Sequence, residues 1–227
     1  MSQLKKLASD TAIYGLSSVA GRLLNYLLVP LYTSVFLPGE YGIVTELYAY
    51  VAFLNILYAF GLETAYFRFA SQNSDREQEY FSTSVLFIGL LSLILSGGLA
   101  FSATAIVDLL QYPGQEQYVY SLSAIMAIDG IAAIPFAQLR IKGKAVKFAV
   151  VKIANVSLNI GFNLVFLLVL PNTEGILGLS YDASVGVGYV FLANLIANAA
   201  LIPLLWRELS HVRLSLSRSA LKELLNY

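Results

Sequence analysis

The sequence predicts an all-α polytopic membrane protein with six transmembrane helices, and three observations carry that prediction. Only 12% of the 227 residues are charged, about half the fraction found in soluble domains, while 58% are hydrophobic. The mean hydropathy is +0.70. The apolar residues form six long blocks that lack the alternation of β-barrel strands. A chain this apolar does not stay solvated, which excludes a water-soluble domain and a disordered chain.

Each apolar block is long enough to cross a bilayer as a helix. The blocks contain 23 to 27 residues, which rise about 35–40 Å against a hydrocarbon core of ~30 Å. The first block is longer than a signal-peptide core and lacks a small-residue cleavage motif, so it is predicted to be retained. Prolines 30, 135 and 203 predict kinks in the first, fourth and sixth blocks. The expected spans are Thr11 to Phe36, Ile43 to Phe69, Phe81 to Val107, Gln117 to Leu139, Ala145 to Leu170 and Ser184 to Trp206.

The basic residues predict the orientation of these spans. Three alternate loops, at residues 38–41, 108–116 and 171–183, contain no Lys or Arg. Because Lys and Arg collect in cytoplasmic loops, the opposite side is predicted to be cytoplasmic and to hold both termini. Twelve of the fourteen basic residues lie on that side: Lys5, Lys6, Arg68, Arg76, Arg140, Lys142, Lys144, Lys147, Arg207, Arg213, Arg218 and Lys222.

Three ionisable residues fall inside the predicted spans. The two remaining bases are Arg22 and Lys152, and Asp129 lies near the middle of the fourth span. A charge in the membrane needs a partner or water, so each is a candidate for a substrate or ion path. Arg22 and Asp129 are each about 15 Å from the inner side and are expected to be able to meet, either as a structural pair or in a functional cavity. Lys152 is less deep, and its side chain reaching the interface is an equal alternative.

Amide side chains accompany the buried charges. At 100° per residue, Asn25 falls on the face of Arg22, and Lys152, Asn155, Asn159 and Asn163 fall within about 80° of one another. Such a stripe is expected to face a cavity rather than lipid. The alternative is that these asparagines form hydrogen bonds between helices and have no direct role in binding.

Recognisable catalytic and nucleotide-binding motifs are missing from the sequence. It contains no GxxxxGK[ST] phosphate loop, no HExxH or GxSxG motif, and no cysteine. The loops are also too short for a catalytic domain. The protein is therefore expected not to be an enzyme and to use no cofactor and no metal.

Two neighbouring motifs give the sequence a family resemblance. Residues 21–44, GRLLNYLLVPLYTSVFLPGEYGIV, and residues 60–69, FGLETAYFRF, pair an arginine-bearing helix with L-P-x-E-Y-G and F-G-L-x-x-A-x-x-R-F. This pattern resembles the polysaccharide-biosynthesis flippases of the multidrug/oligosaccharidyl-lipid/polysaccharide exporter superfamily. Residues 134–170 are similar to the connection between the family's fourth and fifth helices. Members have two lobes of six helices, so residues 1–206 are expected to form an N-terminal lobe. Residues 207–227 would be a cytoplasmic segment leading to a second lobe.

The resemblance implies a function in the cytoplasmic (inner) membrane. A member would move a polyprenyl-pyrophosphate-linked oligosaccharide across the membrane by alternating access, for lipopolysaccharide O-antigen, exopolysaccharide or capsule synthesis. Its partners would be the bilayer, the lipid-linked oligosaccharide and polysaccharide polymerases or glycosyltransferases, with no nucleic acid. A cation-coupled multidrug antiporter of the same superfamily and an inactive or scaffolding half-transporter are the alternatives. In a flippase, the substrate cavity would be lined by Arg22, Asn25, Lys152, Asn155, Asn159 and Asn163, with Asp129 as an ion-coupling group or counter-ion.

Overall fold

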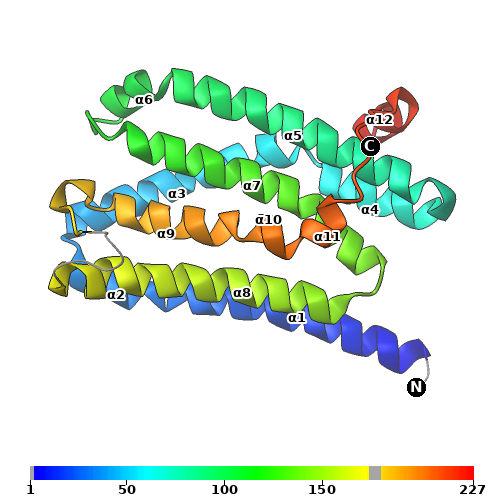
Figure 1. Ribbon diagram of the computed structural model, residues 1–227, viewed down its shortest axis with the longest axis horizontal. Helices are drawn as coiled ribbons and strands as arrows, with labels where there is room; N and C mark the ends of the chain where they lie inside the picture. The colour runs from blue at the N-terminus through cyan, green and yellow to red at the C-terminus, as the bar shows by residue number, and fades with distance from the viewer. Residues whose placement is uncertain (1–2, 174–179) are drawn as a thin grey trace.

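The computed structural model describes residues 3–173 and 180–227, and in α1 it describes side chains from Ser9 on, except those of Ser18, Arg22 and Asn25. Over these residues the chain is helical and contains no strand, which confirms the all-α prediction. The longer helices lie side by side along one axis (Figure 1). Their bounds are α1 Gln3–Tyr26, α2 Leu28–Val35, α3 Pro38–Ala59, α4 Leu62–Gln72, α5 Glu77–Phe101, α6 Ala103–Leu109, α7 Glu116–Ile141, α8 Ala145–Leu164, α9 Gly188–Ala199, α10 Leu201–Leu204, α11 Trp206–Leu209 and α12 Arg218–Leu225.

Four helical segments are long and apolar enough to cross a membrane. They match the second to fifth predicted spans and cover Pro38–Gln72, Ser74–Phe101, Glu116–Ile141 and Ala145–Asn172. The first and sixth predicted spans are not among these four segments; the first is divided into α1 and α2, and the sixth into α9, α10 and α11. Gly188–Leu204 is a shorter apolar helical segment. The crossing of all six segments therefore remains a prediction.

Proline accounts for both of these interruptions. Pro30 lacks the N–H that would bond to the carbonyl of residue 26, which is where α1 ends. Pro203 likewise cannot bond to the carbonyl of residue 199, and α9 ends there. Pro135 lies inside α7 without ending it. A third interruption, between α3 and α4, comes from Phe60 and Gly61, which have left-handed φ values of 47° and 68°.

The chain passes back and forth so that α1 begins and α12 ends at the same end of the bundle (Figure 1). We call this the terminal end and the opposite one the far end. At the far end, α2 turns into α3, and the aromatic rings of Tyr32 and Tyr41 pack with centroids 6.2 Å apart. A buried apolar cluster continues from there into the bundle, and it includes Phe166, Leu167 and Leu170.

The fifth predicted span changes helix type near the far end. α8 is α-helical to Leu164 and continues as a π-helical turn, Val165–Val169, and a 3₁₀ turn, Leu170–Asn172. At the terminal end, a short 3₁₀ turn, Ser74–Arg76, links α4 to α5. The last helix, α12, buries Ala220 and Leu224 in a second apolar cluster with residues of α4 and α5.

Candidate functional site

A row of charged side chains leads from the terminal end of the bundle toward its middle. We call it the polar row and define it as Glu63 of α4, Arg140 and Asp129 of α7, and Lys152 of α8. Arg140 lies one residue before the end of α7, and Asp129 lies eleven residues further in, a rise of about 16 Å. The charge of Lys152 interacts with those of Asp129, Glu63 and Arg140. Three helices therefore converge on one electrostatic cluster.

Asp129 is the inner charge of the polar row. Its side chain is exposed, although Tyr48 of α3, Lys152 of α8 and Asn198 of α9 all interact with it. An exposed carboxylate with neighbours from three other helices borders an accessible space between them. Asp129 is thus available to water or a ligand.

Lys152 is held from two directions. Its ammonium nitrogen lies 4.3 Å from the centre of the Phe136 ring, which supplies a cation–π contact about two turns from Asp129 on α7. Its charge is attracted by Asp129 and Glu63 and repelled by Arg140. The ammonium is therefore positioned inside the bundle, next to a carboxylate, rather than directed into solvent.

Glu63 and Arg140 form the mouth of the polar row. The Arg140 Nη2 pairs with Glu63 Oε1, and both side chains are partly exposed. The sequence predicted Arg140 on the inner side but gave it no partner. Their pairing depends on α4 packing against α7, a contact that the sequence pattern does not contain.

Amide side chains extend the row beyond Asp129. Asn155 Nδ2 donates to Asn198 Oδ1 and to the Ala197 carbonyl, both at 2.9 Å, and so joins α8 to α9. Asn198 in turn interacts with the Asp129 carboxylate, so a chain of polar side chains runs from Asp129 to Asn155. Asn155 is only half-buried, so one side of this chain stays accessible.

Toward the far end the polar contacts are buried between helices. The Tyr32 hydroxyl donates to Asn163 Oδ1 at 3.0 Å, and Asn163 Nδ2 donates to the carbonyl and side-chain oxygens of Asn159. Asn163 is fully buried. In α9, Asn194 donates to the Tyr48 hydroxyl at 2.8 Å. Asn163 therefore links α8 to α2, whereas Asn159 is half-buried.

The predicted site residues divide into three groups. Asp129, Lys152 and Asn155 come together as one connected cluster. Asn159 and Asn163 lie further along α8, where Asn163 matches the alternative of an interhelical hydrogen bond. Arg22 and Asn25 lie on α1, beside α8, but their side chains are outside the described residues. The expected meeting of Arg22 with Asp129 is therefore untested, and the described partners of Asp129 are Lys152, Asn198 and Tyr48.

Among residues 3–173 and 180–227, no group of three or more His, Asp or Glu side chains is placed to hold a metal ion. The polar row contains two acids and two bases, all from described side chains. Such an arrangement can exchange ion-pair partners: an incoming anion competes with Asp129 for Lys152, and a proton or cation competes with Lys152 for Asp129.

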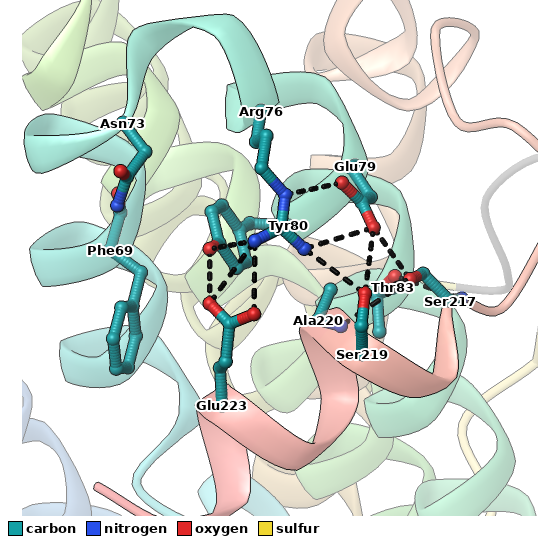
Figure 2. Close-up of polar contacts among 10 residues, drawn as sticks. All are labelled: Phe69, Asn73, Arg76, Glu79, Tyr80, Thr83, Ser217, Ser219, Ala220 and Glu223. Atoms are coloured by element: carbon teal, nitrogen blue, oxygen red, sulfur yellow. Dashed lines mark hydrogen bonds and ion pairs between the residues drawn. The ribbon is translucent and has the colours of Figure 1, made fainter.

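A second polar cluster, at the start of α5, was not predicted from the sequence. Figure 2 shows Arg76 between Glu79 of α5 and Glu223 of α12, with Tyr80 donating to the same Glu223 carboxylate. Ser217 and Ser219 also donate to Glu79. The amphipathic pattern of residues 218–225 was the available signal, because it places Ala220 and Leu224 on one face.

Comparisons with known proteins give the chain a family. Residues 35–227 match the model of a family described as polysaccharide biosynthesis protein. Searches of curated proteins and of solved structures each found no match. The family match covers most of the chain, including every residue of the polar row and of the cluster at α12, and the four membrane-length segments agree with a membrane location. The chain belongs to the polysaccharide biosynthesis protein family.

Proposed function

We propose that the protein is a flippase that moves a polyprenyl-pyrophosphate-linked oligosaccharide across the cytoplasmic membrane for polysaccharide synthesis, and not an enzyme. The polar row is the observation that carries this proposal. It begins at the terminal end, reaches the middle of the bundle, and leaves a carboxylate exposed next to an ammonium. A charged headgroup that crosses an apolar layer needs such a path, since charges in the membrane are costly without partners.

Lys152 is the group that would meet the pyrophosphate. At rest its charge is attracted by that of Asp129, although the two side chains form no ion pair within 4.0 Å. A pyrophosphate carries more negative charge than one carboxylate and offers several acceptor oxygens, so it can replace Asp129 as the partner of Lys152. Asp129 would then need a proton, a cation or a base such as Arg22. Substrate entry and ion uptake would thereby be linked through one exchange of partners.

The half-buried amides suit the sugar part of the substrate. Asn155 and Asn159 are each partly accessible, and amide groups both donate to and accept from sugar hydroxyls. Asn163 is buried against Tyr32, so it would reach the sugar only after α2 and α8 separate. We assign the first sugar contacts to Asn155 and Asn159, and Asn25 would join them from α1.

The proposed orientation places the terminal end in the cytoplasm. The Lys and Arg side chains described there have no counterpart in the described loops of the far end, at residues 36–37, 110–115, 171–173 and 180–182. The substrate would enter from the cytoplasmic side, where lipid-linked oligosaccharides are assembled. Transport by alternating access would require a second lobe or a second copy, with polymerases or glycosyltransferases as functional partners.

The charge balance of the polar row bears on the alternative of a multidrug antiporter. A site for cationic drugs is best served by an excess of acidic groups. The polar row contains equal numbers of acids and bases, and the ammonium of Lys152 would repel a cation beside Asp129. The described charges therefore support an anionic headgroup better than a cationic drug.

The test measures translocation of the polyprenyl-pyrophosphate oligosaccharide by the full chain, in cells or in proteoliposomes. Loss of a charge-assisted contact predicts that Lys152→Gln lowers the rate about tenfold or more, whereas Lys152→Arg keeps part of it. Asp129→Asn is expected to lower the rate and to weaken its dependence on the ion gradient. Arg68→Gln, an exposed cation outside the polar row, serves as the matched control. Normal translocation by Lys152→Gln at normal protein levels would disprove the role of Lys152.

A further inference from the structure

The segment between α11 and α12, residues 210–217, runs along the side of α5 and is attached mainly through its backbone. We call it the strap. Gln78 Nε2 donates to the His211 carbonyl at 2.7 Å, and the Arg213 amide donates to Ser82 Oγ at 3.0 Å. The Ser217 amide donates to Thr83 Oγ1 at 3.3 Å. Because its main chain makes these contacts, most of its side chains are left free to face outward.

The strap lies beside α5 rather than beyond its end. Ser82 and Thr83 are five and six residues after the start of α5, which corresponds to about 8–9 Å along the helix axis. α5 belongs to a membrane-length segment, Ser74–Phe101. A strap at that position lies at the boundary between the headgroups and the hydrocarbon of a bilayer that contains α5.

The strap and its flanks expose large apolar side chains at this level. Leu214 is 92% exposed, Leu216 is 45% exposed, and Trp206, at the start of α11, is 65% exposed. Trp206 is also the single tryptophan of the chain. Leucine and tryptophan side chains are the usual apolar anchors of segments that lie in the membrane interface.

The same region carries four exposed cations without acidic partners. Arg207, Arg213, Arg218 and Lys222 take part in none of the ion pairs of the described residues, although each is exposed. The nearby acids are already in use, since Glu79 and Glu223 pair with Arg76, and Glu208 pairs with Lys144 and Lys147. Four positive charges therefore remain available to a negatively charged partner.

We propose that the strap and the outer face of α12 bind the anionic headgroups of the bilayer, with Leu214 and Leu216 inserted among the lipids. Apolar anchors flanked by free cations have the charge and polarity that an anionic lipid surface requires. An acidic protein would satisfy the cations but would leave the two leucines facing a polar surface. This inference does not depend on flippase activity, and it assigns a lipid-binding role to residues outside the polar row.

The absence of cysteine from the chain permits a direct test with single labels. Leu214→Cys is labelled with an environment-sensitive fluorophore, and the full chain is placed in nanodiscs of zwitterionic phosphatidylcholine with increasing fractions of phosphatidylglycerol. Phe53→Cys, in the middle of α3, gives the fluorescence of the label in lipid. Asn226→Cys, at the end of α12, gives its fluorescence in water. Because both leaflets of a nanodisc have one composition, the result is independent of the protein's orientation.

The label at position 214 is expected to report lipid contact, as the label at position 53 does. A triple variant that carries Arg213→Gln, Arg218→Gln and Lys222→Gln is expected to need a higher fraction of phosphatidylglycerol for the same lipid contact. Each neutralised cation is expected to weaken the association with the anionic lipid about fivefold. Dependence on phosphatidylglycerol that disappears in the triple variant supports the proposal. A label at 214 as water-exposed as position 226 in every lipid mixture, or equally immersed in both variants, would overturn it.

Discussion

Arg76 and Glu223 are 147 residues apart in the chain, yet their side chains meet with Nη1 and Oε1 separated by 2.9 Å. The same guanidinium bonds to Glu79 at 2.7 Å, so Arg76 links the first turn of α5 to α12 (Figure 2). Both partners are more than a third exposed, and the pair alone contributes little to stability. Its significance is positional, because it fixes where α12 lies relative to the strap.

The docking of α12 is expected to depend on pH through Glu223. Hydrogen bonds from Tyr80 and Arg76 hold the pKa of Glu223 below its ordinary value of about 4.3. Because the docked state has the lower pKa, the contribution of Glu223 is fully present above about pH 4.3 and is lost as the pH falls through the lowered value. Hydrogen exchange in residues 218–225, corrected for its intrinsic pH dependence, is expected to accelerate there. In Glu223→Gln the exchange should already be faster at neutral pH and should lose this pH dependence; an unchanged profile would contradict the assignment.

The Tyr32 to Asn163 contact is expected to be a coupled pair between α2 and α8. Asn163→Leu leaves the buried Tyr32 hydroxyl without its acceptor, and Tyr32→Phe leaves the amide oxygen without its donor. Each single change is expected to lower the free energy of unfolding by about 1 kcal/mol. In the double variant the two losses should not add, because the same bond is removed twice. Thermal unfolding in detergent measures all four proteins, and full additivity would show that the bond contributes nothing.

Gly61 is expected to tolerate substitution poorly. Its φ of 68° lies in the left-handed region, where a Cβ costs about 1 kcal/mol. No atom lies within 4 Å of the position of that Cβ, so the loss in Gly61→Ala would come from the backbone alone. Gly42→Ala is the control: its added methyl is equally unobstructed, but it lies inside α3 and should be neutral or stabilising. Equal stability of the two variants would show that the break between α3 and α4 is not strained.

Single cysteines can also establish the orientation of the bundle. Lys142→Cys and Ser210→Cys lie at the terminal end, and Gln117→Cys and Ser180→Cys lie at the far end; all four residues are exposed. An impermeant thiol reagent added to intact cells is expected to label only the two far-end positions, and the other two only after the membrane is opened. The reverse result would place the terminal end outside and would remove the proposed entry side for the substrate.

Hydrophobic periodicity and length predicted the all-α architecture and four of the membrane-length segments, because a bilayer demands long apolar helices. Proline chemistry accounts for the two predicted spans that the structure interrupts, at positions 26 and 199. The sequence also placed Lys152, Asn155, Asn159 and Asn163 on one face of a helix, since that follows from 100° per residue.

The partners across helices were not predictable in the same way. Asn198 joins Asp129 to Asn155, and Glu63 meets Arg140, only because α9 and α4 pack against their neighbours. Residues distant in the chain have no fixed spacing from which such contacts can be read. The same holds for α12. Its amphipathic pattern predicts that one face is buried, but it does not predict that α5 is the helix that packs against that face.

The aromatic packing at the far end gives the bundle a directional interior. The polar row opens at Glu63 and Arg140, and the amides carry it inward, but beyond Asn163 the way is occupied by Tyr32, Tyr41 and the apolar cluster around Phe166. The polar side chains therefore lie toward the terminal end, whereas the far end is filled by aromatic and apolar side chains. In the proposed flippase, a headgroup would leave at the far end only after the Tyr32 to Asn163 bond breaks and α2 separates from α3. Under that proposal, this one hydrogen bond would help to keep the outer side closed until the substrate has entered.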